Sequence, residues 1–303
     1  MRRDFSQISW DAATESQWRQ LVRMALAEDI GHSGDLTSQA LVELDRPGAA
    51  VVAPRQAGVM AGLAGVPALL QEVDRRLQWT SLAEDAQTVS AGQLVGRIEG
   101  PAQSILACER ILLNFLGRLS GIASLTRHYV EAVAGTKAAI YDTRKTTPGW
   151  RRLEKYAVRC GGGRNHRTGL FDAVLIKDNH LAFCQGRLSP AQAVRKTRTY
   201  LQQIQQPDDL VEIEVDRLDQ LDEVLQAGPD LILLDNMSLD ELRQAVRRRN
   251  ALNRRVLLEA SGGVRLDTVR QIALTGVDRI SVGALTHSAP SLDLGLDWAA
   301  YPA

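Results

Sequence analysis

The hydrophobic pattern of the first half of the chain is typical of short strands framed by helices. Between residues 47 and 100 the apolar runs are brief and bounded by glycine, as in "AAVVA", "GVMAG" and "QLVGRIEG". Such runs favour strands joined by tight turns and predict an antiparallel arrangement. Helical spacing precedes them at the start of 15–38, interrupts them at 62–77 and follows them at 102–133.

The pattern changes after residue 135 to strands that alternate with helices. Between the strand-length runs lie segments of helical spacing, such as "LSPAQAVRKTRTYLQQI" and "SLDELRQAVRRRN". This alternation predicts βα units and a parallel sheet, and six units in succession favour a barrel over an open sheet. The predicted strands are 138–143, 172–178, 210–216, 230–236, 255–261 and 279–284.

Polar residues stand where these predicted strands end, which is where α/β barrels carry their chemistry. Each one alone also fits a solvated charge or a turn. Lys177, Glu214 and Asp235, however, lie in very apolar strands, and a charge buried there without a partner costs several kcal/mol. We therefore expect them to share a cavity. The strand-end residues are Arg144, Lys145, Lys177, Glu214 and Asp235.

Two glycine loops follow the last two predicted strands. Ser261, Gly262 and Gly263 lie between a strand and a predicted helix, and Gly283 follows the next strand. Small residues let backbone N–H groups approach phosphate oxygens, and late βα loops are the usual phosphate sites of barrels. Tight turns alone are the alternative interpretation.

The segment "CGGGRNHRTGL" at residues 160–170 raises a different question, because three consecutive glycines precede His166 and Arg167. It follows a stretch of helical spacing rather than a strand, so a phosphate-binding role is disfavoured. We interpret the glycines as backbone freedom that lets the histidine and arginine face an anionic substrate.

Arg110 lies at the margin of an apolar helical stripe, between Leu106 and Leu113. It either extends along that surface or forms a structural salt bridge. Alternatively it offers its guanidinium to a bound carboxylate, across a subunit boundary.

Composition narrows the classes of function. The 36 Lys and Arg balance the 36 Asp and Glu, so nothing favours nucleic acid or a membrane surface as partner. We expect no membrane span, since no apolar run reaches about 18 residues, and no signal peptide, since residues 1–18 lack an apolar core. Three cysteines without a C-x-x-C pair indicate reduced thiols in a cytoplasmic protein and disfavour metal binding by cysteine.

The candidate site nevertheless has a strong charge pattern, because six cationic candidates face two carboxylates. Such a cavity suits a substrate with several negative charges. The carboxylates of Glu214 and Asp235 could hold a divalent ion that bridges phosphates, or stabilise positive charge on a sugar. The cationic candidates are Arg110, Arg144, Lys145, His166, Arg167 and Lys177.

These residues lie in motifs that resemble those of the quinolinate phosphoribosyltransferases, also called carboxylating nicotinate-nucleotide pyrophosphorylases. The motifs include "CERILLNFLGRLSGIASLT", "DTRKTTPGWRRLEKYAVRCGGGRNHRTGLFDAVLIKDNH", "VEIEVD", "LILLDN", "EASGGV" and "DRISVGALTHSAPSLDLGLD". The resemblance implies an α/β fold with an N-terminal α/β sandwich domain and a C-terminal incomplete α/β barrel of parallel strands. The domains would span 1–125, joined by about 289–303, and 126–288.

The resemblance also implies a reaction. Quinolinate and 5-phosphoribosyl-1-pyrophosphate would give nicotinate mononucleotide, pyrophosphate and CO2 for NAD biosynthesis, with Mg2+ as cofactor. The enzyme would be a homodimer or larger assembly in which Arg110 reaches the site of the neighbouring subunit.

Site roles follow from the same resemblance, position by position. The residues that would act in catalysis are Lys145, Lys177, Glu214 and Asp235. The quinolinate pocket would hold Arg110, Arg144, His166, Arg167 and Lys177. Lys145 would lie near the pyrophosphate, whereas Glu214 and Asp235 would face the ribose and bind Mg2+ directly or indirectly. The phosphate of the phosphoribosyl group would meet Ser261, Gly262 and Gly283.

Three other functions stay open on the residues alone. A Schiff-base aldolase would use Lys177 as its nucleophile. A nicotinate phosphoribosyltransferase would act without releasing CO2, and an anion-binding regulatory protein would bind phosphoribosyl pyrophosphate without releasing pyrophosphate.

Overall fold

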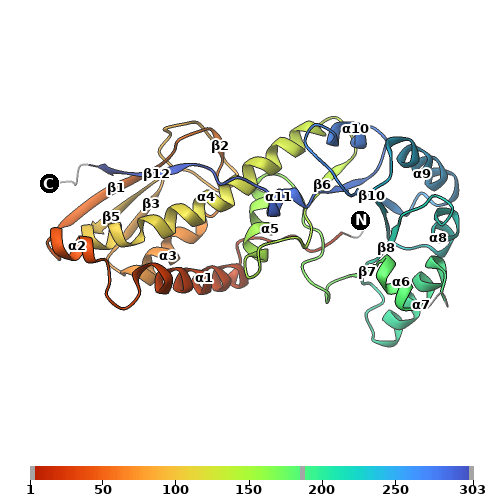
Figure 1. Cartoon of the computed structure of the whole chain (residues 1–303), viewed down its shortest axis with the longest axis horizontal. Helices are drawn as coiled ribbons and strands as arrows, with labels where there is room; N and C mark the ends of the chain where they lie inside the picture. Colours follow the sequence, from red (N-terminus) through yellow and green to blue (C-terminus); the bar gives the residue numbers. More distant parts are fainter. Residues whose placement is uncertain (1–3, 185–187, 300–303) are drawn as a thin grey trace. The chain divides into compact units, whose positions relative to one another are not determined.

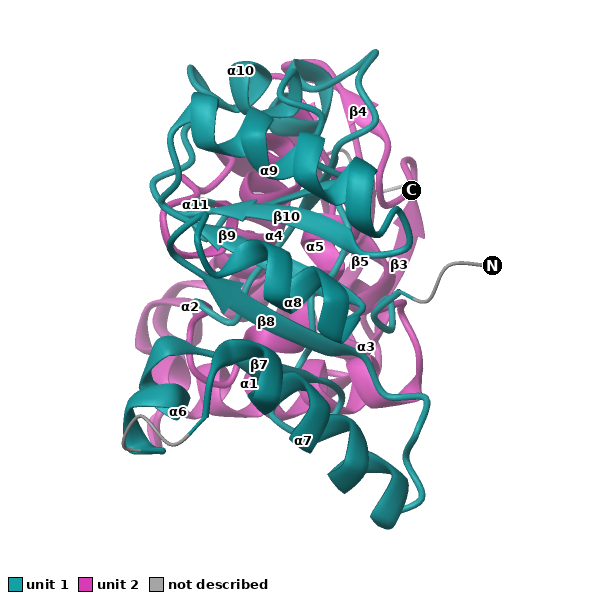
Figure 2. Cartoon of the chain, turned by 90° about the vertical axis from the view of Figure 1, so that its right-hand side faces the viewer, with its two compact units in different colours: residues 1–7, 128–145, 163–284 teal, residues 8–127, 146–162, 285–303 magenta. Residues whose placement is uncertain are grey.

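A computed structural model describes residues 4–184 and 188–299 of the chain. The chain forms two compact units, each built from separate stretches of sequence (Figures 1 and 2). Unit 1 comprises residues 1–7, 128–145 and 163–284, and unit 2 comprises 8–127, 146–162 and 285–303. The domain boundary at residue 125 stays a prediction.

Unit 2 is built around an antiparallel sheet, which confirms the antiparallel arrangement expected from residues 47–100. Its strand order is β12 (Leu294–Ala299), β1 (Pro47–Pro54), β5 (Gly96–Pro101) and β3 (Gln78–Ser81). The C-terminal strand β12 pairs with β1, so that Leu296 lies opposite Val52. A second, two-stranded sheet joins β2 (Gly58–Val59) to β4 (Thr88–Val89).

The helices of unit 2 bury apolar stripes, as their spacing predicts. In α1 the residues Trp18 and Val22, four positions apart, are fully buried, and Asp11 caps the helix by accepting a hydrogen bond from the backbone N–H of Thr14 (2.8 Å). The helices and the 3-10 turn of this part are α1 (Ala12–Ile30), α2 (Leu36–Leu41), η1 (Leu63–Gly65), α3 (Val66–Val73), α4 (Ala102–Ala132), whose last turns belong to unit 1, and α5 (Arg151–Cys160).

Unit 1 contains a six-stranded parallel sheet, which confirms the predicted βα organisation. The strands are β6 (Ala139–Tyr141), β11 (Arg279–Ser281), β10 (Leu257–Ser261), β9 (Leu231–Asp235), β8 (Val211–Val215) and β7 (Val174–Ile176), in that spatial order. Every neighbouring pair is parallel. Because β6 and β7 are the two ends of this order, the described strands do not close into a complete barrel, as the predicted incomplete barrel requires.

Between β7 and β11, helices return the chain from each strand to the next. Two of them, α7 and α9, begin with a serine capping box. The side chain of Ser189 or Ser238 accepts a hydrogen bond from the backbone N–H of the third residue of the helix. The helices are α6 (Asp178–Phe183), α7 (Pro190–Gln203), α8 (Leu221–Ala227), α9 (Leu239–Leu252), α10 (Val269–Ala273) and α11 (Ala284–His287). Within the described ranges, no helix is long and apolar enough to span a membrane.

Candidate active site

The predicted strand-end residues of unit 1 lie along one edge of its sheet. Glu214 is the fourth residue of β8, and Asp235 and Ser261 are the last residues of β9 and β10. In the parallel register, Ser261 lies beside Asp235, and Lys177 follows β7 directly as the N-cap of α6. The parallel sheet therefore gathers these side chains at its carboxyl edge.

Glu214 lies between charges of both signs at this edge. Burial raises its pKa, the positive charge of Lys177 lowers it, and the negative charge of Asp235 raises it again. Lys177 Nζ lies 3.9 Å from Glu214 Oε2. Two carboxylates on adjacent strands offer hard oxygen ligands, the kind that Mg2+ prefers. These residues therefore fit the predicted metal role.

The loop after β10 has a backbone that only glycine adopts easily. Gly262 and Gly263 have φ angles of +93° and +57°. A Cβ atom on Gly262 would lie 2.1 Å from Asn236 Oδ1, whereas one on Gly263 would meet nothing within 4 Å. Asn236 itself has φ +54° and donates its backbone N–H to the carbonyl of Ser261 (2.9 Å). This close packing leaves an exposed backbone turn suited to an anion.

Two arginines of unit 1 lie close enough to repel one another. Arg167 is buried, and its Nη1 donates a hydrogen bond to the Ala173 carbonyl (3.0 Å). Burial lowers the pKa of Arg167 and the positive charge of Arg144 lowers it further, while Glu212 opposes both. Arg144 Nε is buried and finds no hydrogen-bond partner among the described residues. Such a pair of guanidinium groups fits an incoming carboxylate.

The segment that follows the triple glycine is fixed rather than loose. The backbone of Arg164 bonds with that of β6, donating to Ile140 and accepting from Asp142. The buried carboxylate of Asp142 accepts hydrogen bonds from the backbone N–H of His166 (2.8 Å) and the side chain of Asn165 (2.7 Å). The segment is thus an added strand-like stretch beside β6, which places Arg167 in a defined position.

The local packing and backbone of unit 2 explain why positions 161 and 162 are glycines. A Cβ atom on Gly161 would lie 2.4 Å from the Ala123 carbonyl of α4, so a larger residue does not fit. Gly162 has a φ of +90°, which favours glycine. The backbone freedom expected here therefore serves a close approach and a left-handed turn, not a mobile arm.

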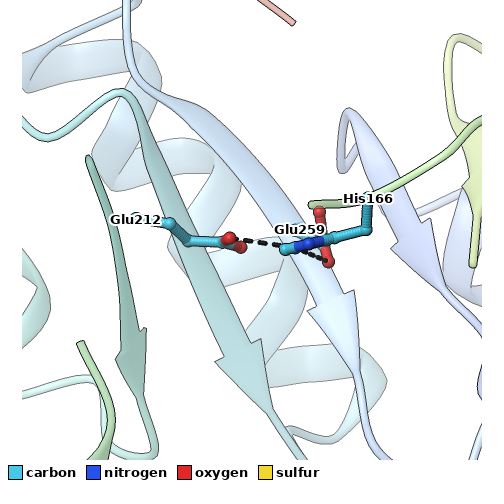
Figure 3. A group of neighbouring side chains, drawn as sticks. All are labelled: His166, Glu212 and Glu259. Atoms are coloured by element: carbon cyan, nitrogen blue, oxygen red, sulfur yellow. Dashed lines mark ion pairs between the residues drawn. The ribbon is translucent and has the colours of Figure 1, made fainter. Parts of the chain in front are cut away.

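His166 meets two glutamates that sequence reasoning missed. Its Nε2 lies 2.9 Å from Glu212 Oε2 and 3.6 Å from Glu259 Oε1, and both glutamates are fully buried (Figure 3). The three ligand-type atoms lie within 4.8 Å of one another, so the group could also hold a metal ion. Glu212 stands two residues before Glu214 in "VEIEV", which places both on one face of β8; that period was the available signal.

The remaining predicted residues are Lys145, Gly283 and Arg110. Lys145 is exposed after β6, and Gly283 lies between β11 and α11. Arg110 belongs to unit 2, where it is exposed on α4 and makes no hydrogen bond or ion pair with the described part of the chain. It lines a cavity of about 360 Å³ in that unit with Asn114 and Asp293.

The glycine loop and the two carboxylates at the edge of the parallel sheet, together with the pair of guanidinium groups, are chemically suited to an enzyme with an anionic substrate. Family models narrow the class: the N-terminal domain of quinolinate phosphoribosyl transferase matches residues 35–120, and its C-terminal domain matches 122–297. The chain therefore belongs to the quinolinate phosphoribosyltransferase family.

Individual relatives agree over nearly the full length. The chain is 43% identical to the carboxylating nicotinate-nucleotide pyrophosphorylase of Mycobacterium leprae, covering 96% of this chain and 99% of that one. The relative from Arabidopsis thaliana is 40% identical over 91% of this chain and 81% of that protein. The solved nicotinate-nucleotide pyrophosphorylase of Francisella tularensis superposes with a TM-score of 0.88 at 38% identity, covering 98% and 100% of the two chains.

A human nicotinic acid phosphoribosyltransferase structure is 13% identical with a TM-score of 0.60, which shows a shared fold alone.

Proposed function

We propose that this chain catalyses phosphoribosyl transfer to quinolinate with loss of CO2, giving nicotinate mononucleotide and pyrophosphate. Family membership supports the reaction. One observation in the site carries the choice of substrate: the guanidinium groups of Arg144 and Arg167 repel one another, and Arg144 Nε lacks a hydrogen-bond partner among the described residues. A pyridine dicarboxylate would supply the missing negative charge.

In the first step the pyridine nitrogen of quinolinate attacks C1 of the ribosyl group while the bond from C1 to pyrophosphate breaks. Positive charge develops on the sugar, and the carboxylates of Glu214 and Asp235 would stabilise it from the strand edge. Lys145 would attract the departing pyrophosphate, and the loops of Ser261, Gly262 and Gly283 would bind the 5-phosphate through backbone N–H groups.

We propose that Glu214 and Asp235 also hold Mg2+, directly or through water. When bound, the ion would neutralise the charge of the pyrophosphate and assist its departure. Burial, and to a smaller extent the negative charge of Asp235, raise the pKa of Glu214, and this supports the assignment because a divalent cation would relieve the repulsion between the two carboxylates.

In the second step the quaternary ring nitrogen stabilises the electron pair left at the adjacent carbon when its carboxylate leaves as CO2. A proton then adds to that carbon. Arg144, Arg167 and Lys177 would orient the two carboxylates so that the correct one lies next to the ribosylated nitrogen. His166, also predicted for this pocket, would support it from beneath, because its side chain is only 7% exposed and faces Glu212.

We further propose a homodimer or larger assembly, in which Arg110 completes the site of the neighbouring subunit. The exposure of Arg110 on α4 supports this proposal. A cytoplasmic location is proposed as well, and Cys108, Cys160 and Cys184 support it because none forms a disulfide in the described structure.

The test of the reaction uses the purified chain with quinolinate, phosphoribosyl pyrophosphate and Mg2+. Pyrophosphate and CO2 are expected in equal amounts, and replacing quinolinate by nicotinate should abolish pyrophosphate release. Release of pyrophosphate with nicotinate, or none with quinolinate, would contradict the proposal.

The test of the pocket compares Arg167→Ala with Arg217→Ala, whose side chain is exposed and pairs with Asp219. A charged hydrogen bond contributes about 1.5–3 kcal/mol, so Arg167→Ala should lower kcat/KM for quinolinate by roughly 10- to 150-fold. The Arg217 variant should match the wild type. Wild-type KM and kcat in Arg167→Ala would refute the assignment.

The shared site is tested by complementation. Arg110→Ala and Glu214→Ala should each be inactive alone, and mixing them under exchange conditions should restore activity through hybrids with one intact site. Failure to recover activity, although hybrids form, would show that Arg110 does not act across subunits.

A further inference from the structure

The buried cluster around His166 lies one layer beneath the proposed substrate residues. Side chains two positions apart on a strand point to the same face. Glu212 thus lies below Glu214 on β8, and Glu259 lies below Ser261 on β10. Both glutamates are fully buried. Their side chains point toward the imidazole of His166 (Figure 3).

Both ring nitrogens of His166 face neighbouring groups of the protein. Its Nδ1 accepts a hydrogen bond from the backbone N–H of Arg167 at 2.8 Å, so this nitrogen carries a lone pair and no hydrogen. Its Nε2 faces oxygens of Glu212 and Glu259 at 2.9 and 3.6 Å. A bare nitrogen would repel these carboxyl oxygens, whereas Nε2–H is attracted to them, so the surroundings select the Nε2–H tautomer.

The ring is also held on its face. Phe5 stacks on the imidazole with ring centroids 4.2 Å apart. Side-chain exposure of His166 is only 7%, so the ring offers little surface to a ligand. The imidazole is therefore held in a fixed position between the two glutamates and the backbone of Arg167.

The surroundings of Glu259 raise the pKa of its carboxyl group. Burial, and then the charge of Glu212, raise the pKa of Glu259 to about 7, while His166 and Arg279 oppose this rise. Arg279 is buried, pairs with Asp4 at 3.1 Å and lies over the ring of Tyr141. His166 and Arg279 therefore oppose the accumulation of negative charge in this cluster.

We propose that Glu212 and Glu259 are positioning residues for quinolinate binding: they fix the Nε2–H tautomer of His166, whose Nδ1 then anchors the backbone of Arg167. The guanidinium of Arg167, tied at Nη1 to Ala173, is thereby held in place for the substrate carboxylate. This inference rests on the proposed function for its substrate, but the tautomer it requires is independent of any substrate.

The first test measures the tautomer by 15N NMR of the imidazole groups. The chain has five histidines, and a His166→Gln variant identifies the signals of interest. In the wild type, we expect a pyridine-type Nδ1 and a pyrrole-type Nε2 near neutral pH. Glu212→Leu should mix or reverse these two signals, and Glu212→Gln, which keeps an acceptor oxygen, should retain them.

The second test separates KM from kcat. Loss of an anchored Arg167 weakens ground-state and transition-state binding alike, so Glu212→Leu should raise KM for quinolinate by about tenfold or more with little change in kcat. KM for phosphoribosyl pyrophosphate should stay unchanged. Glu212→Gln should show a smaller rise and serves if the leucine variant does not fold. Glu223→Gln, an exposed glutamate of α8, is the matched control.

Three outcomes would overturn the proposal. The first is a wild-type signal pattern and quinolinate KM in Glu212→Leu and Glu259→Gln. The second is a wild-type Nε2 without hydrogen. The third is a stoichiometric metal ion in the purified wild type that Glu212→Gln loses, because Nε2 would then be a ligand. If the wild type is inactive with quinolinate yet shows the expected tautomer, the proposed function fails and the positioning of the Arg167 backbone stands.

Discussion

Removing the positive charge of Lys177 should raise the pKa of Glu214. Lys177 Nζ lies 3.9 Å from Glu214 Oε2, and the two side chains are 46% and 16% exposed. Unit charges at this distance attract by about 1 kcal/mol in water and about 4 kcal/mol at an effective dielectric constant of 20. Because the lysine is half exposed, the lower figure of about 1 kcal/mol applies.

The sign follows from the charge states. The lysine favours the ionised carboxylate, so its loss in Lys177→Met favours the protonated form and raises a pKa that burial has already raised. The variant keeps a side chain of similar length.

The assay is a 13C NMR titration of glutamate carboxyl carbons in metal-free buffer, with Glu214→Gln identifying the signal. Lys196→Met, which removes an exposed lysine of α7, should leave the midpoint of Glu214 unchanged. A midpoint in Lys177→Met equal to or below that of the wild type would refute the electrostatic description of the strand edge.

Three further predictions concern stability. Gly262→Ala adds a steric clash to an unfavourable φ and should cost more than Gly92→Ala, where φ is also positive but the space is open, by about 1–3 kcal/mol in urea unfolding; equal costs would contradict the packing. Glu154 is fully buried and pairs with Arg118 at 2.6 Å, so Glu154→Ala should cost about 3–5 kcal/mol, and a loss below about 1 kcal/mol would contradict this. The raised pKa of Glu259 means that the folded chain binds the Glu259 proton more tightly than the unfolded chain, so the unfolding free energy falls as the pH rises from about 4.5 to 7. Glu259→Gln should make this fall smaller, and a slope equal to that of the wild type would contradict the prediction.

The parallel sheet could be predicted because its strands carry their own signal. Runs such as "DLILLDN" are apolar at almost every position, as strands buried on both faces require, and the helices between them show helical spacing. The strand ends were less predictable: residues 138–143 were expected to form a strand, but β6 spans only Ala139–Tyr141. Ladder length depends on neighbouring strands that are distant in sequence.

The candidate site was predictable only where chemistry and strand position coincide. Glu214 and Asp235 stood out because they are charged residues within, or at the end of, apolar strands. Glu259 and Asp142 did not, since their importance lies in contacts with the segment around His166 that no local pattern encodes. Glu212 shares the two-residue period of Glu214, but that period does not reveal its contact with His166. The same limit applies to Gly161, because its need for glycine arises from the approach of a distant helix.

The most direct test of the central claim follows one carbon through the reaction. Quinolinate labelled with 13C in the carboxylate next to the ring nitrogen is incubated with the chain, phosphoribosyl pyrophosphate and Mg2+. The account predicts that all label appears in CO2 and bicarbonate, mole for mole with pyrophosphate, and that the nicotinate mononucleotide is unlabelled. Label retained in a nucleotide product, or pyrophosphate released without labelled CO2, would contradict it.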